Sequence, residues 1–120
     1  MSDTIIKKTP YYEPTNVELA WIFNTAKTAN TPFFTDDLDP FNVADTPCLI
    51  RIYVTLSTQA VLSLTRTRET TTVTEKLNGG SQLSAGCAYI FDTAASDNEI
   101  LNLVTDADTT ILKLSVFWVV

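Results

Sequence analysis

The sequence predicts an all-β protein: a single antiparallel β-sandwich or jelly-roll-like domain at residues 17–120, preceded by an extended N-terminal arm at residues 1–16. Three observations predict this class. Threonine, valine, isoleucine, tyrosine and phenylalanine, which strands favour, are prominent throughout the 120 residues. Apolar residues recur at every second position in several segments, which is the period of a strand with one buried face. Turn-forming residues separate these segments at the spacing typical of sandwiches, and about eight strands fit this length.

The arm is predicted from two prolines. Pro10 and Pro14 each hold the preceding residue extended and lack an amide donor, so this segment is not expected to be a central strand. Tyr11 and Tyr12 lie between the two prolines. Two interpretations stay open for the segment. It is either a frayed terminus or an arm that lays both tyrosines on a neighbouring subunit.

Residues 17–24 are the most ambiguous element. Every second residue is apolar and strand-favouring: Val17, Leu19, Trp21 and Phe23. A capping-box pattern at residues 15–18 and apolar residues at helical spacing also fit a helix. We predict a strand, because the alternating residues favour β-strands and the other segments of the chain are also predicted to be strands rather than helices. Trp21 is expected to lie in the core.

Residues 31–47 are expected to form a long loop that its own aromatic side chains pack down. These side chains are Phe33, Phe34 and Phe41, among three prolines. A run of carboxylates follows the first two: Asp36, Asp37 and Asp39. Hard cations prefer carboxylate oxygens, but the run lacks the glycine and the closing glutamate of an EF-hand loop. We therefore expect ordinary turn residues and no metal site.

Two alternating segments come next and are predicted to pair as an antiparallel hairpin. The inward residues of segment 48–57 are Cys48, Ile50, Ile52, Val54 and Leu56. Those of segment 59–66 are Ala60, Leu62 and Leu64. The expected solvated or paired surface charges are Arg51, Arg66 and Arg68.

The second half of the chain continues the pattern of short strands and turns. Residues 67–76 are threonine-rich and predict an exposed edge strand, whose Glu75 and Lys76 discourage unwanted pairing. An Asn-Gly-Gly sequence at residues 78–80 predicts a tight turn. The inward face of the next strand is expected to be Leu83, Ala85, Cys87, Tyr89 and Phe91. A short strand at residues 99–104 and a turn at residues 106–108 follow.

The last strand, residues 110–120, becomes apolar on both faces at its end. Its expected core face holds the even-numbered residues Thr110, Leu112, Leu114, Val116, Trp118 and Val120. The opposite face ends with Phe117 and Val119. The rest of the chain or another molecule must cover such a surface. Phe117 and Val119 are therefore candidate interface residues, together with Tyr11 and Tyr12.

Composition excludes several classes of partner. A net charge of −6 and a pI near 4.3 argue against nucleic acid and anionic membranes. No apolar run approaches the length of a transmembrane helix, and the N-terminus lacks the pattern of a signal peptide, so the protein is expected to stay where it is made. Cys48 and Cys87 are then expected to be buried free thiols, with a disulfide between them as the open alternative.

The sequence carries no pattern of a catalytic or cofactor site. It has no histidine, which removes the commonest general base and metal ligand. Two distant cysteines give no zinc spacing, and phosphate-binding and dinucleotide-binding motifs are absent. A glycosidase needs only two carboxylates, but no second acidic partner accompanies the run at residues 36–39. We therefore expect a non-enzymatic protein without a cofactor.

A resemblance to a protein class covers the chain from Pro47 onward. The residues that carry it are 77–92 (LNGGSQLSAGCAYIFD), 100–103 (ILNL) and 112–116 (LKLSV). A turn, an aromatic strand ending in aspartate and a closing apolar strand resemble the small β-sandwich structural proteins of tailed-virus, bacteriophage-like particles. These occur as capsid decoration or tail components. The resemblance implies a virion subunit in contact with a major capsid protein.

The apolar C-terminal strand and the arm predict a homo-oligomer, most simply a closed ring such as a trimer. Two alternatives to a decoration protein stay open besides a tail component. One is a carbohydrate-binding module, with sugar platforms among Tyr11, Tyr12, Tyr53 and Trp21. The other is a filament subunit that a neighbour's arm completes by strand addition.

Overall fold

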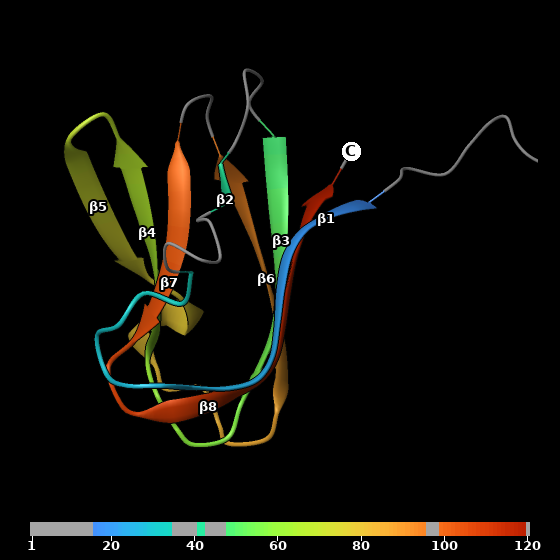
Figure 1. Cartoon of the computed structure of the whole chain (residues 1–120), viewed down its shortest axis with the longest axis vertical. Helices are drawn as coiled ribbons and strands as arrows, with labels where there is room; N and C mark the ends of the chain where they lie inside the picture. The colour runs from blue at the N-terminus through green and yellow to red at the C-terminus, as the bar shows by residue number, and fades with distance from the viewer. Residues whose placement is uncertain (1–15, 35–40, 43–47, 96–98, 120) are drawn as a thin grey trace, which may run out of the picture.

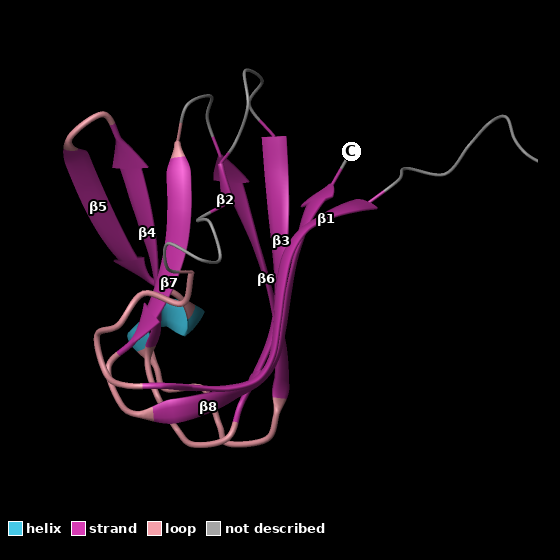
Figure 2. Cartoon of the chain, in the orientation of Figure 1, coloured by secondary structure: helices cyan, strands magenta, loops and turns pink. Residues whose placement is uncertain are grey.

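The computed structural model describes residues 16–34, 41–42, 48–95 and 99–119, and these residues form an all-β protein, as predicted (Figures 1 and 2). The elements in chain order are β1 (Asn16–Lys27), β2 (Phe41–Asn42), β3 (Cys48–Leu56), β4 (Leu62–Arg68), β5 (Thr71–Lys76), the short 3-10 helix η1 (Asn78–Gly80), β6 (Ala88–Ala95), β7 (Ile100–Thr105) and β8 (Thr109–Val119). The ambiguous segment at residues 17–24 is a strand, as predicted. The expected arm lies outside the described residues except for Asn16.

The strands form two four-stranded antiparallel sheets. Their orders are β1-β8-β3-β6 and β2-β7-β4-β5 (Figure 1). The chain turns back between β4 and β5, and each strand of the first half pairs with its counterpart in the second half. These pairs are β1 with β8, β2 with β7, β3 with β6 and β4 with β5. Lateral pairing of β8 with β3 and of β7 with β4 joins them into sheets.

The predicted hairpin between residues 48–57 and 59–66 is wrong. β3 pairs with β8 and β6, whereas β4 pairs with β5 and β7 in the other sheet. Alternation shows which face of a strand is buried but does not show which strand it pairs with. Both segments therefore fitted a hairpin although they belong to different sheets. The predicted inward residues with described side chains are all buried: Ile50, Ile52, Val54, Leu56, Ala60, Leu62 and Leu64.

Aspartates of the predicted turn at residues 106–108 fix the connections between the sheets. The Asp106 carboxylate accepts a hydrogen bond from the Val61 amide at 2.8 Å, where the chain crosses from β3 to β4. The Asp108 carboxylate accepts one from the Ala29 amide at 2.8 Å, just after β1. These carboxylates satisfy backbone donors that no strand partner reaches, which is the usual role of aspartate in turns.

One apolar core lies between the two sheets and includes two phenylalanines from the segment after β1. Phe33 and Phe34 are buried, which confirms the predicted packing of this part of the loop. The Phe33 amide donates to the Leu103 carbonyl at 2.8 Å, and the Asn102 side chain bonds to both the amide and the carbonyl of Phe34. The segment is thus fastened along β7. Asp36, Asp37 and Asp39 lie outside the described residues.

A β-bulge in β8 changes which residues face the core. Against β3, Lys113 pairs with Thr55 but Ile111 pairs with Leu56, so Leu112 is the extra residue. Ile111 is buried and Leu112 is 37% exposed, the reverse of the prediction, while Leu114 and Val116 are buried as predicted. An extra residue shifts the alternation by one position and bends the strand. Figure 1 shows β8 and β1 curving together around the lower end of the core.

The strand predicted to start near Leu83 starts later. Leu83 is buried, but Ala85 and Cys87 are exposed, and Gly86 has a φ of +73° that turns the chain before β6. Tyr89 and Phe91 pack against the core, as predicted. The predicted turn is confirmed, since η1 has positive φ throughout. The exposed edge strand is confirmed at β5, but it is shorter than the predicted residues 67–76, because β4 continues to Arg68 and the chain turns at residues 69–70.

Cys87 is a free thiol, as predicted, but it is exposed rather than buried. Cys48 pairs with Ala95 at one end of β3, whereas Cys87 precedes Ala88, which pairs with Thr55 near the other end. Seven strand residues separate these positions by roughly 23 Å. A disulfide needs Cα atoms within about 7 Å, so the two cysteines cannot bond within one chain.

Candidate interaction surface

The outer face of the β1-β8-β3-β6 sheet carries large apolar side chains in water. Trp21 and Phe23 on β1 are 56% and 52% exposed, and Ile90 on β6 is 59% exposed. The prediction that Trp21 lies in the core is therefore wrong. The pairing of β1 with β8 shifts between Glu18 and Ala20, so Ile22 points inward and its two neighbours point outward.

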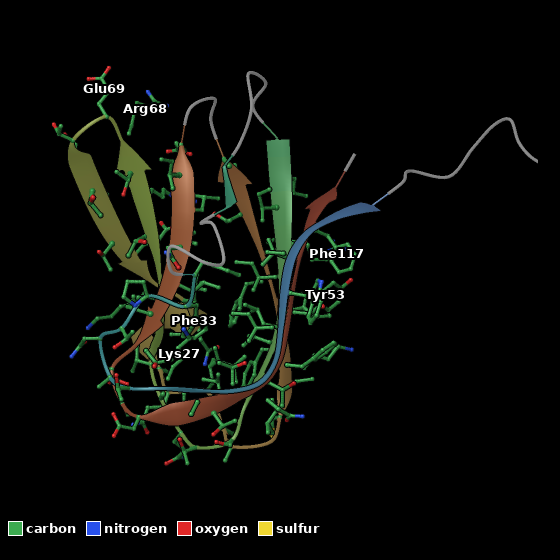
Figure 3. The ribbon with its side chains drawn as sticks, in the orientation of Figure 1. Lys27, Phe33, Tyr53, Arg68, Glu69 and Phe117 are labelled. Atoms are coloured by element: carbon green, nitrogen blue, oxygen red, sulfur yellow. The ribbon has the colours of Figure 1, made fainter. Side chains whose placement is uncertain are left out.

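Aromatic rings contact one another on this face. The ring centroids of Trp21 and Phe23 are 5.2 Å apart, and those of Tyr53 and Phe117 are 5.5 Å apart in an edge-to-face arrangement. Figure 3 shows Tyr53 and Phe117 on the side of the sheet that faces away from β7. We call the surface made by Trp21, Phe23, Tyr53, Ile90 and Phe117 the aromatic face.

The backbone pairing arranges this face in rows across the four strands. The central row runs from Trp21 through Ser115 and Tyr53 to Ile90. Ser115 is buried although it belongs to the outer face. Cross-strand neighbours stand about 5 Å apart, so the larger Trp21 and Tyr53 flank the small serine.

One ion pair lies beside the aromatic rings. The Arg51 guanidinium donates two hydrogen bonds to the Asp92 carboxylate, at 2.7 and 2.9 Å, between paired residues of β3 and β6. These bonds hold the pKa of Asp92 below its ordinary value and raise the pKa of Arg51. Lys113, next to Phe23 in the pairing, is exposed. Two of these three charges are positive, although the chain carries a net charge of −6.

The lowered pKa of Asp92 predicts a specific acid sensitivity. A carboxyl group whose pKa is lower in the folded protein than in the unfolded protein stabilises the fold at pH values above its ordinary pKa of about 4. This stabilisation is lost as the pH falls through the lower pKa of the folded state. The Asp92→Asn variant should show a flatter dependence of unfolding free energy on pH below about pH 4. Because the pair is exposed, the change should be small. Arg51→Gln should flatten the same window, and urea unfolding curves unchanged by either variant would contradict the assignment.

A second polar cluster joins the two sheets around Arg66. Its guanidinium donates to the Ala94 carbonyl and the Thr93 hydroxyl of β6 and forms ion pairs with Glu75 and Glu99. The neighbouring hollow of about 390 Å³ is lined by Arg66, Arg68, Glu69, Thr71, Val73 and Glu99. Figure 3 places Arg68 and Glu69 at the tip of the β4–β5 turn. Because the Arg66 guanidinium binds two carboxylates and groups of β6, we infer that this cluster holds the two sheets together.

Of the four predicted interface residues, Phe117 alone has a side chain that the structure describes. Phe117 belongs to the aromatic face and is half-buried against Tyr53. Tyr11 and Tyr12 lie outside the described residues. Val119 is the last residue of β8, and its side chain is also outside the described part.

Sequence reasoning missed three of the most exposed apolar side chains on this sheet. Ile90 could have been found, because it alternates with the inward residues Tyr89 and Phe91. Trp21 and Phe23 could not, since no local sequence signal marks the shift after Glu18.

The described residues contain no group of three or more histidine, cysteine or acidic side chains that could hold a metal ion. In the same part of the chain, no helix has the length and apolar character needed to cross a membrane. The chain matches no protein-family model and no curated protein.

Proposed function

We propose that this protein is a non-enzymatic structural subunit of a virus particle, a capsid decoration protein that forms homo-oligomers and stabilises the shell. The observation that carries the proposal is the exposure of the aromatic face. A buried aromatic side chain covers about 150–250 Å², so the exposed halves of Trp21 and Phe23 alone leave roughly 200 Å² of apolar surface in water. Ile90, Tyr53 and Phe117 enlarge this patch. Contiguous apolar patches of several hundred Å² mark contact sites for other molecules.

The proposed fold is a jelly-roll-like β-sandwich, with the arm of residues 1–16 leading into β1. The pairing of each early strand with its late counterpart supports this fold, because a long antiparallel ribbon wrapped into two sheets gives the same strand pairs. Jelly rolls occur in viral capsid and lectin domains. The fold therefore agrees with a structural role but does not choose the partner.

The proposed location in a virion rests on the resemblance of residues 77–116 to structural proteins of tailed-virus particles. The partners would be further copies of the chain and another virion protein such as a major capsid protein. The acidic net charge of −6 disfavours nucleic acid as a partner. The sequence predicts a trimer, whereas the exposure of the aromatic face favours contact with another molecule without fixing the number of copies.

Immunogold electron microscopy of particles released from cells that carry this gene tests the proposal. An antibody against the chain should label intact particles. Particles grown with Val73→Glu should keep the label, while those grown with Ile90→Glu should lose it, because only Ile90 belongs to the aromatic face. Gold that is confined to unassembled material in the unmodified sample would contradict a virion role.

Carbohydrate binding is a second candidate, and the exposure of Trp21 favours it. Indole and phenol rings stack on the apolar faces of sugars, and Trp21 and Tyr53 lie in one row of the aromatic face. A glycan screen at millimolar ligand, repeated with Trp21→Ala, separates the candidates. Binding that Trp21→Ala abolishes would favour this function, and no binding to any glycan would remove it.

A further inference from the structure

We infer that the aromatic face pairs with the same face of a second copy about a two-fold axis parallel to the strands, running between β8 and β3. The inference deepens the proposed function and rests on it, because it names the partner of the same surface. A self-complementary patch is what a two-fold dimer requires. In the sheet order β1-β8-β3-β6, this rotation lays β1 over β6 of the second copy and β8 over β3 of the second copy.

The central row of the face is complementary to itself under this rotation. Tyr53 meets Ser115 of the second copy, so a large ring lies over a small side chain. Trp21 meets Ile90 of the second copy, which brings the two exposed ends of the row together. Sheets that pack with aligned strands lie about 10 Å apart and interdigitate their side chains in this way.

The two flanking rows differ in how well they match. On one side, Phe23, Lys113, Thr55 and Ala88 form a row, so the exposed Phe23 lies over the small Ala88 of the second copy. On the other side, the row is Glu18, Phe117, Arg51 and Asp92, so the rotation brings Phe117 to Arg51 of the second copy and places the Glu18 position over Asp92 of the second copy. An arginine at an aromatic ring is a favourable contact.

Charge and area agree with a second copy as the occupant. The three rows hold two basic positions and two acidic positions, Arg51, Lys113, Asp92 and Glu18, so each face is close to neutral although the chain carries a net charge of −6. Four strands with about eight residues each give a flat area of roughly 500 Å². With the relief of the side chains, this approaches the roughly 800 Å² per partner of a stable interface.

Cross-linking of single-cysteine variants tests the inference. Phe23→Cys and Ala88→Cys are made separately in a chain whose natural cysteines are replaced, Cys48→Ala and Cys87→Ser. A bismaleimide linker with a reach of about 10 Å is used, because sheets at that spacing are too far apart for a disulfide. An equimolar mixture of the two variants should give covalent dimers, since Phe23 lies over Ala88 of the second copy. Each variant alone should give few, because β1 of one copy lies about 14 Å sideways from β1 of the other.

The outcomes separate this inference from the proposed function. Cross-linking of each variant with itself as efficiently as in the mixture would overturn the two-fold axis parallel to the strands. The absence of cross-links, with a solution mass of one chain for the cysteine-free parent, would overturn a second copy as the occupant. Immunogold labelling of particles is independent of both results, so the virion role can stand when the dimer fails.

Discussion

Replacing Ile90 by glutamate should convert the assembled protein into monomers. Ile90 is 59% exposed on the edge strand β6, so the fold of one chain does not depend on its side chain. In the dimer, a glutamate at this position would lie against Trp21 of the second copy without a cationic partner. Burying an unpaired charge costs several kcal/mol, and the dimer Kd should rise at least roughly 100-fold. Light scattering at fixed concentration measures the change.

Val73→Glu is the matched control for this variant. Val73 is 57% exposed on the edge strand β5, so the two substitutions change charge, size and strand propensity in nearly the same way. Val73 belongs to the other sheet, far from the aromatic face in the strand order. The Val73→Glu protein should keep the mass of the unmodified protein. Equal loss of mass in both variants would show that added charge, rather than the aromatic face, controls assembly.

Replacing Phe33 by alanine should lower the free energy of unfolding by about 3–5 kcal/mol, the usual range for a fully buried phenylalanine. Phe33 has no exposed surface, and its amide is fixed to the Leu103 carbonyl, so the core cannot easily close over the cavity. Figure 3 shows its side chain within the space between the sheets. Urea unfolding measured in the Ile90→Glu background keeps dimerisation out of the measured stability.

Phe23→Ala removes the same atoms from an exposed site and serves as the control. In the Ile90→Glu background it should change the free energy of unfolding by less than about 1 kcal/mol, because Phe23 is 52% exposed. In the otherwise unmodified chain it should weaken assembly. If Phe23→Ala destabilised the single chain as much as Phe33→Ala, the side chain would be part of the core and the aromatic face would lose its main support.

Much of the fold could be predicted, because alternation follows directly from strand geometry. The inward residues of β3 and β4, the exposed edge strand β5 and the turn at η1 all agree with simple periodicity and turn chemistry. The packing of Phe33 and Phe34 under the loop was also predictable, since two adjacent aromatic residues in an irregular segment need cover.

The failures have two physical causes. Strand partners depend on long-range contacts, so the crossing of the chain from β3 to a different sheet at β4 leaves no local signal. Bulges shift the alternation by one residue, and those at Leu19 and Leu112 reversed the expected burial of Trp21 and Leu112. The candidate surface was predicted only in part for this reason. Phe117 was named from the apolar end of β8, whereas Trp21 was assigned to the core.

The solution mass of the unmodified chain across a concentration series tests the central claim most directly. Self-pairing of the aromatic face predicts that light scattering approaches twice the chain mass of 13.3 kDa as concentration rises and falls toward one chain on dilution. A mass of three chains would contradict the two-fold pairing and favour the trimer expected from the sequence. A mass of 13.3 kDa at every concentration would contradict the claim that a second copy covers this face.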